Sequence, residues 1–303
     1  MTGRVVEISE TGKHLSVSRG FLVVTAEKQE LGRVPLADIL VLVISGVGNS
    51  LSTNVVNSLL ENDVSIIFCG PNYHPLGLVW PLGSHHLPVQ RLNLQISASN
   101  PLKKRLWQRL VQAKISNQAA VLDYFGAPDP ALAGLAKRVG SGDPENCEAQ
   151  AARRYWGLLM GPDFRRNTQG DGINSLLNYG YAVLRAATAR AVAIVGLYPA
   201  LGIHHHNQAN PFCLVDDLME PFRPLVDVYV KKIHDRGVAE VTPDSKRELA
   251  GILNLDLTSH LGGSPLSNCL LRLAQSLVKS FESGKPELVL PLSPLPIEIE
   301  AED

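Results

Sequence analysis

The sequence lacks any long hydrophobic run. Its longest purely aliphatic stretches, such as residues 39–44, are far shorter than the roughly 20 residues that a membrane-spanning helix needs. The N-terminus also lacks the basic and then apolar pattern of an export signal. We therefore expect a cytoplasmic protein with no membrane partner. Because 45% of the 303 residues are hydrophobic, the chain can form one or two globular domains, each with its own core.

Cysteine is scarce. The four cysteines lie far apart and none belongs to a CxxC pair: Cys69, Cys147, Cys213 and Cys269. This spacing favours reduced thiols and argues against a disulfide framework or a zinc knuckle. The motifs HExxH, GxSxG, GxxxxGK[ST] and GxGxxG are also absent. The sequence therefore gives no sign of a zinc protease, a serine hydrolase, a P-loop NTPase or a dinucleotide-binding enzyme.

The chain has no overall excess of charge of either sign. It carries 28 Lys and Arg against 29 Asp and Glu, a formal net charge of -1, which at face value argues against a polyanionic partner. The distribution is uneven, however: residues 103–190 hold 13 basic and 7 acidic side chains, a local net charge of +6. Such a stretch can contact a nucleic-acid backbone, or it can simply solvate helix faces.

The first 90 residues predict a β-rich N-terminal domain with one short helix. Short alternating segments separated by Gly and charged turns predict small hairpins at residues 4–9, 15–18, 21–25 and 32–35. Two nearly continuous aliphatic runs, at 38–45 and 64–69, are typical of strands buried on both faces. Between them, Ser52 and Thr53 precede a pattern that predicts a capped helix over 54–60.

Near residue 90 the periodicity changes from about two to about 3.6 residues, which predicts an all-α domain over residues 91–285. The expected helices cover residues 103–124, 131–139, 146–160, 173–195, 218–236, 245–258 and 265–282. Residues 286–303 form a Pro-rich acidic tail that we expect to be extended or disordered. The fold class is therefore α+β, with a β-rich domain followed by a larger all-α domain.

The first candidate catalytic residue is Glu148. Small residues follow it at 149, 151 and 152, which leaves room for a group to approach its carboxylate. Glu145 is a rival acid three residues earlier. The alternative is an ordinary first-turn glutamate that stabilises the N-terminus of its helix.

Two further candidate segments follow a long apolar helix. Residues 204–206 are three consecutive histidines placed after a turn that contains Pro199 and Gly202. They could face a cleft, or lie in a solvated loop. Acids then cluster at Asp216, Asp217 and Glu220, which share a helix face or form an acidic first turn in which Glu220 pairs with Arg223.

Taken together, one imidazole and two or three carboxylates form a hard, mostly oxygen site of the kind that suits Mg²⁺ or Mn²⁺. A structural zinc would instead call for thiolates at short spacing. A divalent ion beside a locally basic helical surface points to phosphodiester chemistry.

With these motifs the sequence resembles the CRISPR-associated integrase family, the first of the Cas proteins, whose members acquire spacers. The matching motifs are residues 148–156, 196–205 and 217–224, with support from 171–181 and from 44–46, 52–53, 68–70 and 74–77 in the β-rich domain. Tyr198 departs from the family pattern, in which an acid is common, but it belongs to the turn and not to the metal set. The length and the region around Phe68 look like type II systems.

The resemblance implies that the N-terminal domain forms a homodimer and that the helical domain holds one divalent ion, Mg²⁺ or Mn²⁺. Glu148, His205 and Glu220 would be the catalytic metal ligands, and Asp217 a further acid ranked below them. The implied partners are double-stranded DNA, both protospacer and CRISPR repeat, and a small second Cas protein that bridges two dimers. The expected DNA contacts are Arg153, Arg154, Arg165, Arg166 and Asn174.

The implied reaction is integration during CRISPR adaptation, an antiviral defence. A protospacer 3′-hydroxyl attacks a repeat phosphodiester, so no protein nucleophile is needed. Two alternatives stay open at this point: a stand-alone metal-dependent DNA endonuclease that uses water as the nucleophile, and a non-catalytic DNA-binding scaffold.

Overall fold

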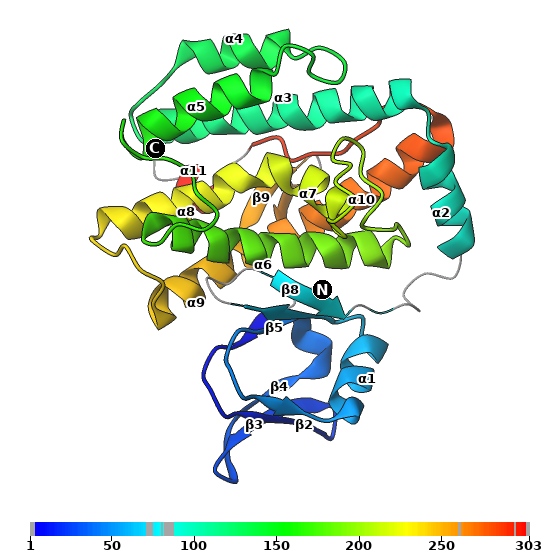
Figure 1. Cartoon of the computed structure of the whole chain (residues 1–303), viewed down its shortest axis with the longest axis vertical. Coiled ribbons are helices and arrows are strands. Elements are labelled where there is room, and N and C mark those ends of the chain that lie inside the picture. Colours follow the sequence, from blue (N-terminus) through cyan, green and yellow to red (C-terminus); the bar gives the residue numbers. More distant parts are fainter. Residues whose placement is uncertain are drawn as a thin grey trace.

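The computed structural model describes residues 4–70, 75–79, 81, 88–259, 262–293 and 295–300. Two units follow one another along the chain (Figure 1): a β-rich N-terminal unit and a larger helical unit, coloured from cyan to red. The predicted α+β class is therefore confirmed. In the described part of the chain, no helix is long and apolar enough to span a bilayer. Residue 74 of the predicted turn at 74–77 and residues 301–303 of the tail lie outside the described residues.

One sheet of the N-terminal unit faces the helices. Its strands are β1 (Arg4–Ile8), β5 (Ile39–Ile44), β7 (Ser65–Cys69) and β8 (Pro75–Val79), in that order across the sheet. The first three are parallel and β8 is antiparallel to β7. Leu42 and Ile44 pack into the core of the unit, whereas Val41 and Val43 contact Ala186 of the helical unit. The aliphatic run of β5 is thus buried on both faces, as predicted.

The second sheet closes the other side of this core. It contains β2 (His14–Ser18), β3 (Phe21–Ala26), β4 (Gln29–Pro35) and β6 (Ser50–Leu51), in the order β4-β3-β2-β6. Helix α1 (Thr53–Glu61) begins where the Ser52 hydroxyl accepts a hydrogen bond from the Val55 amide, 3.4 Å away, as its capping residue predicts. The hairpin prediction holds for β2, β3 and β4 but is wrong for β1, which pairs in parallel with β5.

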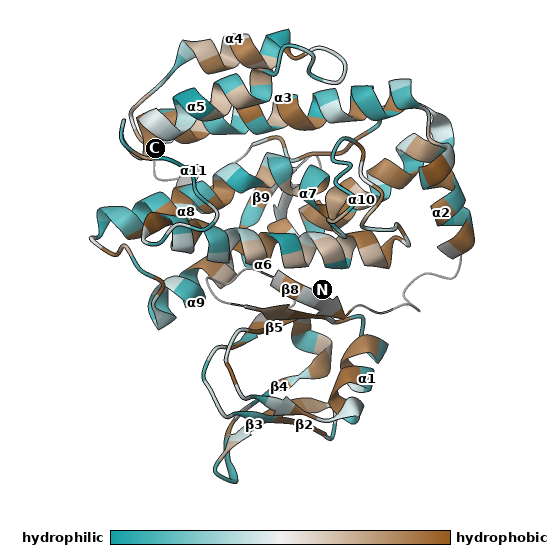
Figure 2. Cartoon of the chain, in the orientation of Figure 1, coloured by the Kyte–Doolittle hydropathy of each residue, from teal (hydrophilic) through white to brown (hydrophobic). Residues whose placement is uncertain are grey.

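The helical unit is arranged around one long apolar helix. Its longer helices are α2 (Pro88–Ser97), α3 (Asn100–Tyr124), α4 (Pro130–Arg138), α5 (Cys147–Leu159), α6 (Ile173–Ile194), α8 (Arg223–Asp235), α9 (Pro243–Gly251) and α10 (Leu266–Ser283). Figure 1 shows α6 between the sheet and the other helices, and Figure 2 shows hydrophobic and hydrophilic residues alternating along it. Most of its side chains are buried, because it packs against β5 and β7 on one side and against helices on the other.

Three features of this unit differ from the sequence-based prediction. The segment is not entirely helical, because β9 (Asp256–Ser259) and β10 (Gly262–Pro265) pair as an antiparallel ribbon where the helix over 245–258 was expected to end. Helix α2 was not among the expected helices, because the Pro- and Gly-containing loop before it was expected to extend to the domain boundary near residue 90. The expected helix over 218–236 is divided into α7 (Cys213–Met219), the 3₁₀ turn η3 (Glu220–Phe222) and α8, since Pro221 has no N–H to donate.

The described part of the tail lies against the helical unit. We expected residues 286–303 to be extended or disordered; the described part has no helix before Ile297, and it follows α10 and bonds to it. The amides of Glu287 and Val289 donate to the hydroxyls of Ser280 and Ser276, each over 2.9 Å. The Leu292 amide then donates to the carbonyl of Thr258 over 2.8 Å, and the short helix α11 (Ile297–Glu300) contacts β9. Composition alone could not reveal these hydroxyl acceptors, which lie on the preceding helix α10.

Candidate active site

Glu148 lies in the first turn of α5, where two side chains cap three backbone amides. The Asp143 carboxylate accepts the amides of Cys147 and Glu148 over 2.9 and 3.0 Å. Asn146 adopts a left-handed backbone, φ 52°, and its side chain accepts the Ala149 amide. These acceptors satisfy amides that a helix start leaves unpaired. They hold Glu148 against α3, as a half-buried side chain.

Lys114 of α3 joins the two predicted glutamate ligands. Its ammonium nitrogen lies 2.5 Å from Glu148 Oε1 and 2.6 Å from Glu220 Oε2. Burial alone would lower the pKa of Lys114, but the charges of Glu220 and Glu148 outweigh burial and raise that pKa. The two carboxylates therefore share one fully charged ammonium. No motif marks this lysine, which is 34 positions from Glu148 in sequence.

Glu220 is buried at the start of η3. Its Oε1 pairs with the Arg223 guanidinium over 2.9 Å, the contact considered for the acidic first turn. Burial would raise the pKa of Glu220, but the charges of Arg223 and Lys114 lower it below its usual value. Its Oε2 lies 2.6 Å from the Lys114 ammonium. This buried oxygen is therefore already in contact with a cation.

His205 is oriented by Asp217, which is fully buried. One Asp217 oxygen accepts the amides of Ile203 and His204 over 2.5 and 2.9 Å. The other oxygen accepts the His205 amide over 3.2 Å and bonds to His205 Nδ1 over 2.6 Å. Nδ1 is therefore engaged, and Nε2 is the ring nitrogen that can bind an ion. Asp217 acts here as a positioning acid.

The chain reverses tightly before the histidines. A Cβ on Gly202 would lie 2.3 Å from the His205 carbonyl oxygen and 2.9 Å from Asp217 Oδ2, so only glycine fits. His204 stacks on Trp107 of α3, with ring centroids 4.2 Å apart, and His206 is exposed. The hydrogen bond that the His205 ring donates to Asp217 raises the pKa of His205, and the charges of Glu220 and Glu148 act in the same direction. Of the three histidines, His205 is therefore the one that can act together with the two glutamates.

The fit of a divalent ion can be judged from these contacts. As the side chains stand, no three His, Cys, Asp or Glu groups within the described ranges converge closely enough to hold an ion. The Lys114 ammonium lies between two of the expected ligands. The donor set nevertheless suits Mg²⁺ or Mn²⁺, since it offers two carboxylates that already face one cation and an imidazole fixed through its other nitrogen.

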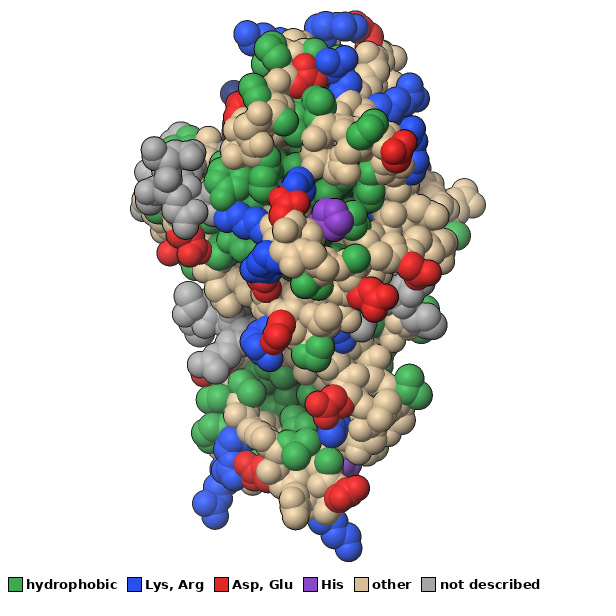
Figure 3. All heavy atoms as spheres, turned by 90° about the vertical axis from the view of Figure 1, so that its left-hand side faces the viewer, with side chains coloured by type: hydrophobic (Ala, Val, Ile, Leu, Met, Phe, Trp, Pro, Cys, Tyr) green, Lys and Arg blue, Asp and Glu red, His purple; other side chains and the backbone are tan. Residues whose placement is uncertain are grey.

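The expected DNA contacts fall into two groups. Arg153 and Arg165 are exposed, and Arg154 is exposed but pairs with Asp129 over 2.7 Å. Arg166, in the loop before α6, instead donates a hydrogen bond to Asn174 in the first turn of α6, over 3.0 Å. Figure 3 shows Lys and Arg side chains along the helical end of the molecule. Its exposed basic residues include Lys104, Arg105, Arg109 and Lys137.

A buried polar cluster beside Glu220 was not anticipated from the sequence. The Asp227 carboxylate accepts the hydroxyls of Tyr155 and Tyr181 over 2.9 and 2.5 Å. Burial raises the pKa of Asp227 to about 7. A cavity of about 220 Å³ adjoins this cluster, and Lys114, Gln118 and Glu220 also line it. The cluster joins residues from three helices, so no local pattern could reveal it.

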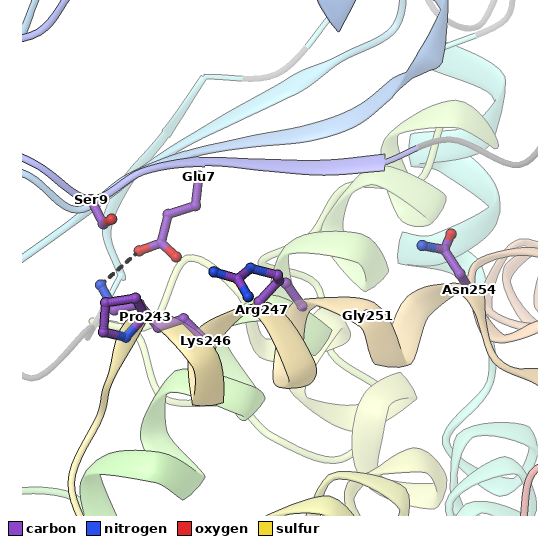
Figure 4. Close-up of a pocket in the computed structure, with 8 residues that line it drawn as sticks. Glu7, Ser9, Pro243, Lys246, Arg247, Gly251 and Asn254 are labelled. Atoms are coloured by element: carbon purple, nitrogen blue, oxygen red, sulfur yellow. Dashed lines mark hydrogen bonds and ion pairs between the residues drawn. The ribbon is translucent and has the colours of Figure 1, made fainter. Parts of the chain in front are cut away.

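A second, larger cavity lies at the seam between the two units, away from the predicted metal ligands. Its volume is about 440 Å³, and Glu7 of β1 and Lys246 of α9 lie on opposite walls (Figure 4). The Glu7 carboxylate pairs with the Lys246 ammonium over 3.1 Å and accepts the Tyr179 hydroxyl over 2.5 Å. These contacts connect the sheet to the helical unit.

Comparison with known proteins settles the family. The family model "CRISPR associated protein Cas1" matches residues 6–258. The chain belongs to the Cas1 family. It is 38% identical to "CRISPR-associated endonuclease Cas1" of Neisseria meningitidis serogroup C (strain 8013) over 291 residues, which cover 94% of this chain and 92% of that protein.

Solved structures share the fold of this Cas1 family member. A casposase bound to its integration product matches with a TM-score of 0.81 and 22% identity, covering 98% of this chain and 95% of that one. A chain of a Cas6-RT-Cas1–Cas2 complex matches with a TM-score of 0.76 and 17% identity, over 97% of this chain and 36% of that one. At these identities the likeness establishes the fold, and the chemistry must be argued from the site.

Proposed function

We propose that the protein is a metal-dependent DNA integrase that inserts protospacer DNA into a CRISPR array. Membership of the Cas1 family supports a role in CRISPR adaptation, and the Neisseria relative is named an endonuclease. The single observation that carries the proposal is the grouping of Glu148 and Glu220 around one cation, next to a His205 ring held by Asp217.

In this proposal Glu148, His205 and Glu220 hold Mg²⁺ or Mn²⁺, and Asp217 orients the imidazole. When bound, the ion supplies electrostatic stabilisation of the charge that develops on the phosphoryl oxygens. The exposed arginines Arg153 and Arg165 hold the DNA backbone by phosphate contacts, which position the duplex without reading its sequence. Sequence preference then depends on DNA shape or on partner proteins.

The reaction is a transesterification. The donor 3′-hydroxyl oxygen forms a new bond to a repeat phosphorus while that phosphorus loses its bond to the 3′ oxygen of the neighbouring nucleotide. The hydroxyl proton passes to solvent and the leaving oxygen takes one up, so the number of phosphodiester bonds is unchanged. No protein nucleophile and no energy source are needed.

The proposed assembly contains a homodimer formed by the β-rich unit and a small second Cas protein that bridges two dimers. The solved Cas6-RT-Cas1–Cas2 complex, which contains a chain of the same fold, is named for Cas1 and Cas2 together. An assembly of several subunits would present more basic surface to DNA than one chain does. This suits a protein whose own net charge is only -1.

The test is strand joining by ligand variants. We expect Glu148→Ala, His205→Ala and Glu220→Ala to abolish joining of a labelled donor to a leader-repeat target. Since Glu220→Ala leaves Lys114 and Arg223 buried without their acid, Glu220→Gln serves as a second variant. Glu145→Ala is the matched control, because Glu145 is an exposed acid that pairs with Arg138 beside the same helix.

Melting curves should show that the variants are folded, and the control should join strands like the wild type. Full joining by a folded variant of any one ligand would contradict its assignment.

A further inference from the structure

We propose that Lys114 is an internal cation that takes the place of the divalent ion in the metal-free protein, and that ion binding requires its ammonium to move away. This inference rests on the proposed function, because it concerns the same Glu148 and Glu220 carboxylates. It adds a residue that belongs to none of the three motifs used to find the site.

The first argument is the position of the ammonium. It contacts one oxygen of Glu148 and one of Glu220, at 2.5 and 2.6 Å, and its own side chain is only 12% exposed. Two carboxylates brought together away from water repel each other unless a cation lies between them. Lys114 therefore stabilises the metal-free arrangement of both acids.

The second argument is that the ammonium and a divalent ion cannot share these oxygens. Carboxylate oxygens bind Mg²⁺ at about 2.0–2.1 Å, so an ion between the same two oxygens would lie next to the ammonium. Repulsion between the two cations in a largely buried site is strong. The other oxygen of Glu220 already pairs with Arg223, which leaves Oε2 as its ligand atom.

The third argument is that a place for the displaced ammonium exists. Gln118 lies one turn further along α3, on the same face as Lys114. The Gln118 side chain is 3% exposed and its Oε1 has no hydrogen-bond partner. Both residues line the cavity of about 220 Å³. The flexible stem of Lys114 can therefore carry the ammonium from the two acids to a buried acceptor without exposing it to bulk water.

The experiment measures Mn²⁺ binding to the full chain by titration calorimetry, without DNA. We expect Lys114→Met to bind Mn²⁺ about tenfold more tightly than the wild type, equivalent to about 1.4 kcal/mol. Lys114→Gln is the second variant in case the methionine side chain perturbs folding. Lys137→Met is the matched control, since Lys137 is exposed on α4, and it should bind as the wild type does.

A second measurement, the melting temperature without metal, tests the role of Lys114 in the metal-free protein. Lys114→Met should melt below the wild type without metal, and saturating Mn²⁺ should reduce the difference. If the wild type binds Mn²⁺ and both folded Lys114 variants bind it equally or more weakly, the Lys114 proposal is overturned while the metal site stands. If neither the wild type nor any variant binds Mn²⁺, both proposals fail.

Gln118→Leu tests the destination of the ammonium. It removes the free acceptor and should weaken Mn²⁺ binding relative to the wild type. Unchanged binding by this variant would contradict the assignment of Gln118, independently of the Lys114 result.

Discussion

The buried carboxylates of the helical unit are compensated in three different ways. Glu220 has the cations Lys114 and Arg223. Asp217 accepts three backbone amides and bonds to the His205 ring. Asp227 has two tyrosine hydroxyls, which are neutral donors. Since burial outweighs these two hydroxyls, Asp227 is the acid whose charge is least stabilised.

A pH dependence of stability follows from Asp227. Burial raises its pKa in the folded protein to about 7, whereas an unfolded aspartate titrates near 3.9. As the pH rises between these values the unfolded chain releases its proton first, so the free energy of unfolding falls. Between pH 5 and pH 8 the ionisation of Asp227 should lower the free energy of unfolding by on the order of 2 kcal/mol. The Asp227→Asn variant should not show this decrease.

Urea unfolding of both proteins at pH 5 and pH 8 measures this difference. If the free energy of unfolding changes equally in the wild type and the variant between pH 5 and pH 8, Asp227 does not titrate in that range.

Some site residues could be predicted from the sequence and others could not. Glu148, His205 and Glu220 stand in short motifs with characteristic neighbours, such as the small residues after Glu148 and the tight turn before His205. The role of Lys114 is different, because it depends on α3 lying against both α5 and η3. The Asp227 cluster likewise joins Tyr155 and Asp227 over 72 positions. Such pairings depend on tertiary packing and leave no local signal.

At the scale of elements, the close approach of α6 and α8 determines how the helical core is packed. Gly180 lies in the middle of α6, and a Cβ there would lie 2.4 Å from Cγ1 of Val226 on α8. Glycine is otherwise unfavourable inside a helix. Its presence here therefore reflects the contact between helices.

Gly180→Ala should accordingly lower the free energy of unfolding by about 1–3 kcal/mol, because the new methyl group overpacks the contact. Adding Val226→Ala should restore part of the loss, since the two sites are in contact. Gly134→Ala in α4, where a Cβ would meet no atom within 4 Å, is the matched control and should be neutral or stabilising. Denaturant unfolding of the wild type and these three variants measures the effects, and equal changes at Gly180 and Gly134 would contradict the packing argument.

Element boundaries were predictable where local chemistry sets them. Helices α1 and α4 begin at the side-chain caps Ser52 and Asp129, and α10 ends at Gly284, which has a positive φ of 69°. The ribbon of β9 and β10 was not predictable in this way. Its four-residue strands carry little periodicity, and they are stabilised by pairing with each other.

At the scale of the whole molecule, the near-zero net charge conceals two groups of basic residues, one bonded internally and one exposed. Several basic residues of the +6 stretch are used internally, such as Lys114, Arg166 and Arg185. Others remain exposed on the helical end (Figure 3). The charge available to DNA is thus smaller than the sequence count, which favours binding by an assembly over binding by one chain.

The contacts between the β-rich unit and the helical unit also matter for the molecule as a whole. Glu7 of β1 bonds to Tyr179 of α6 and Lys246 of α9 (Figure 4), and Ala186 of α6 packs on the aliphatic face of β5. The β-rich unit and the helical unit are therefore connected by both polar and apolar contacts. A dimer formed through the β-rich unit would orient two candidate active sites through this seam.

The most direct test of integrase chemistry uses two donor ends and one target. A labelled donor duplex with a 3′-hydroxyl and the same duplex with a 3′-dideoxy end are each incubated with the protein, its second Cas partner and leader-repeat DNA, with Mg²⁺ or with EDTA. We predict a branched product in which the donor is joined to the repeat, formed with the 3′-hydroxyl donor and Mg²⁺ and absent in the other three reactions. Shortened strands alone, formed equally with both donors, would contradict the account and indicate a nuclease that uses water.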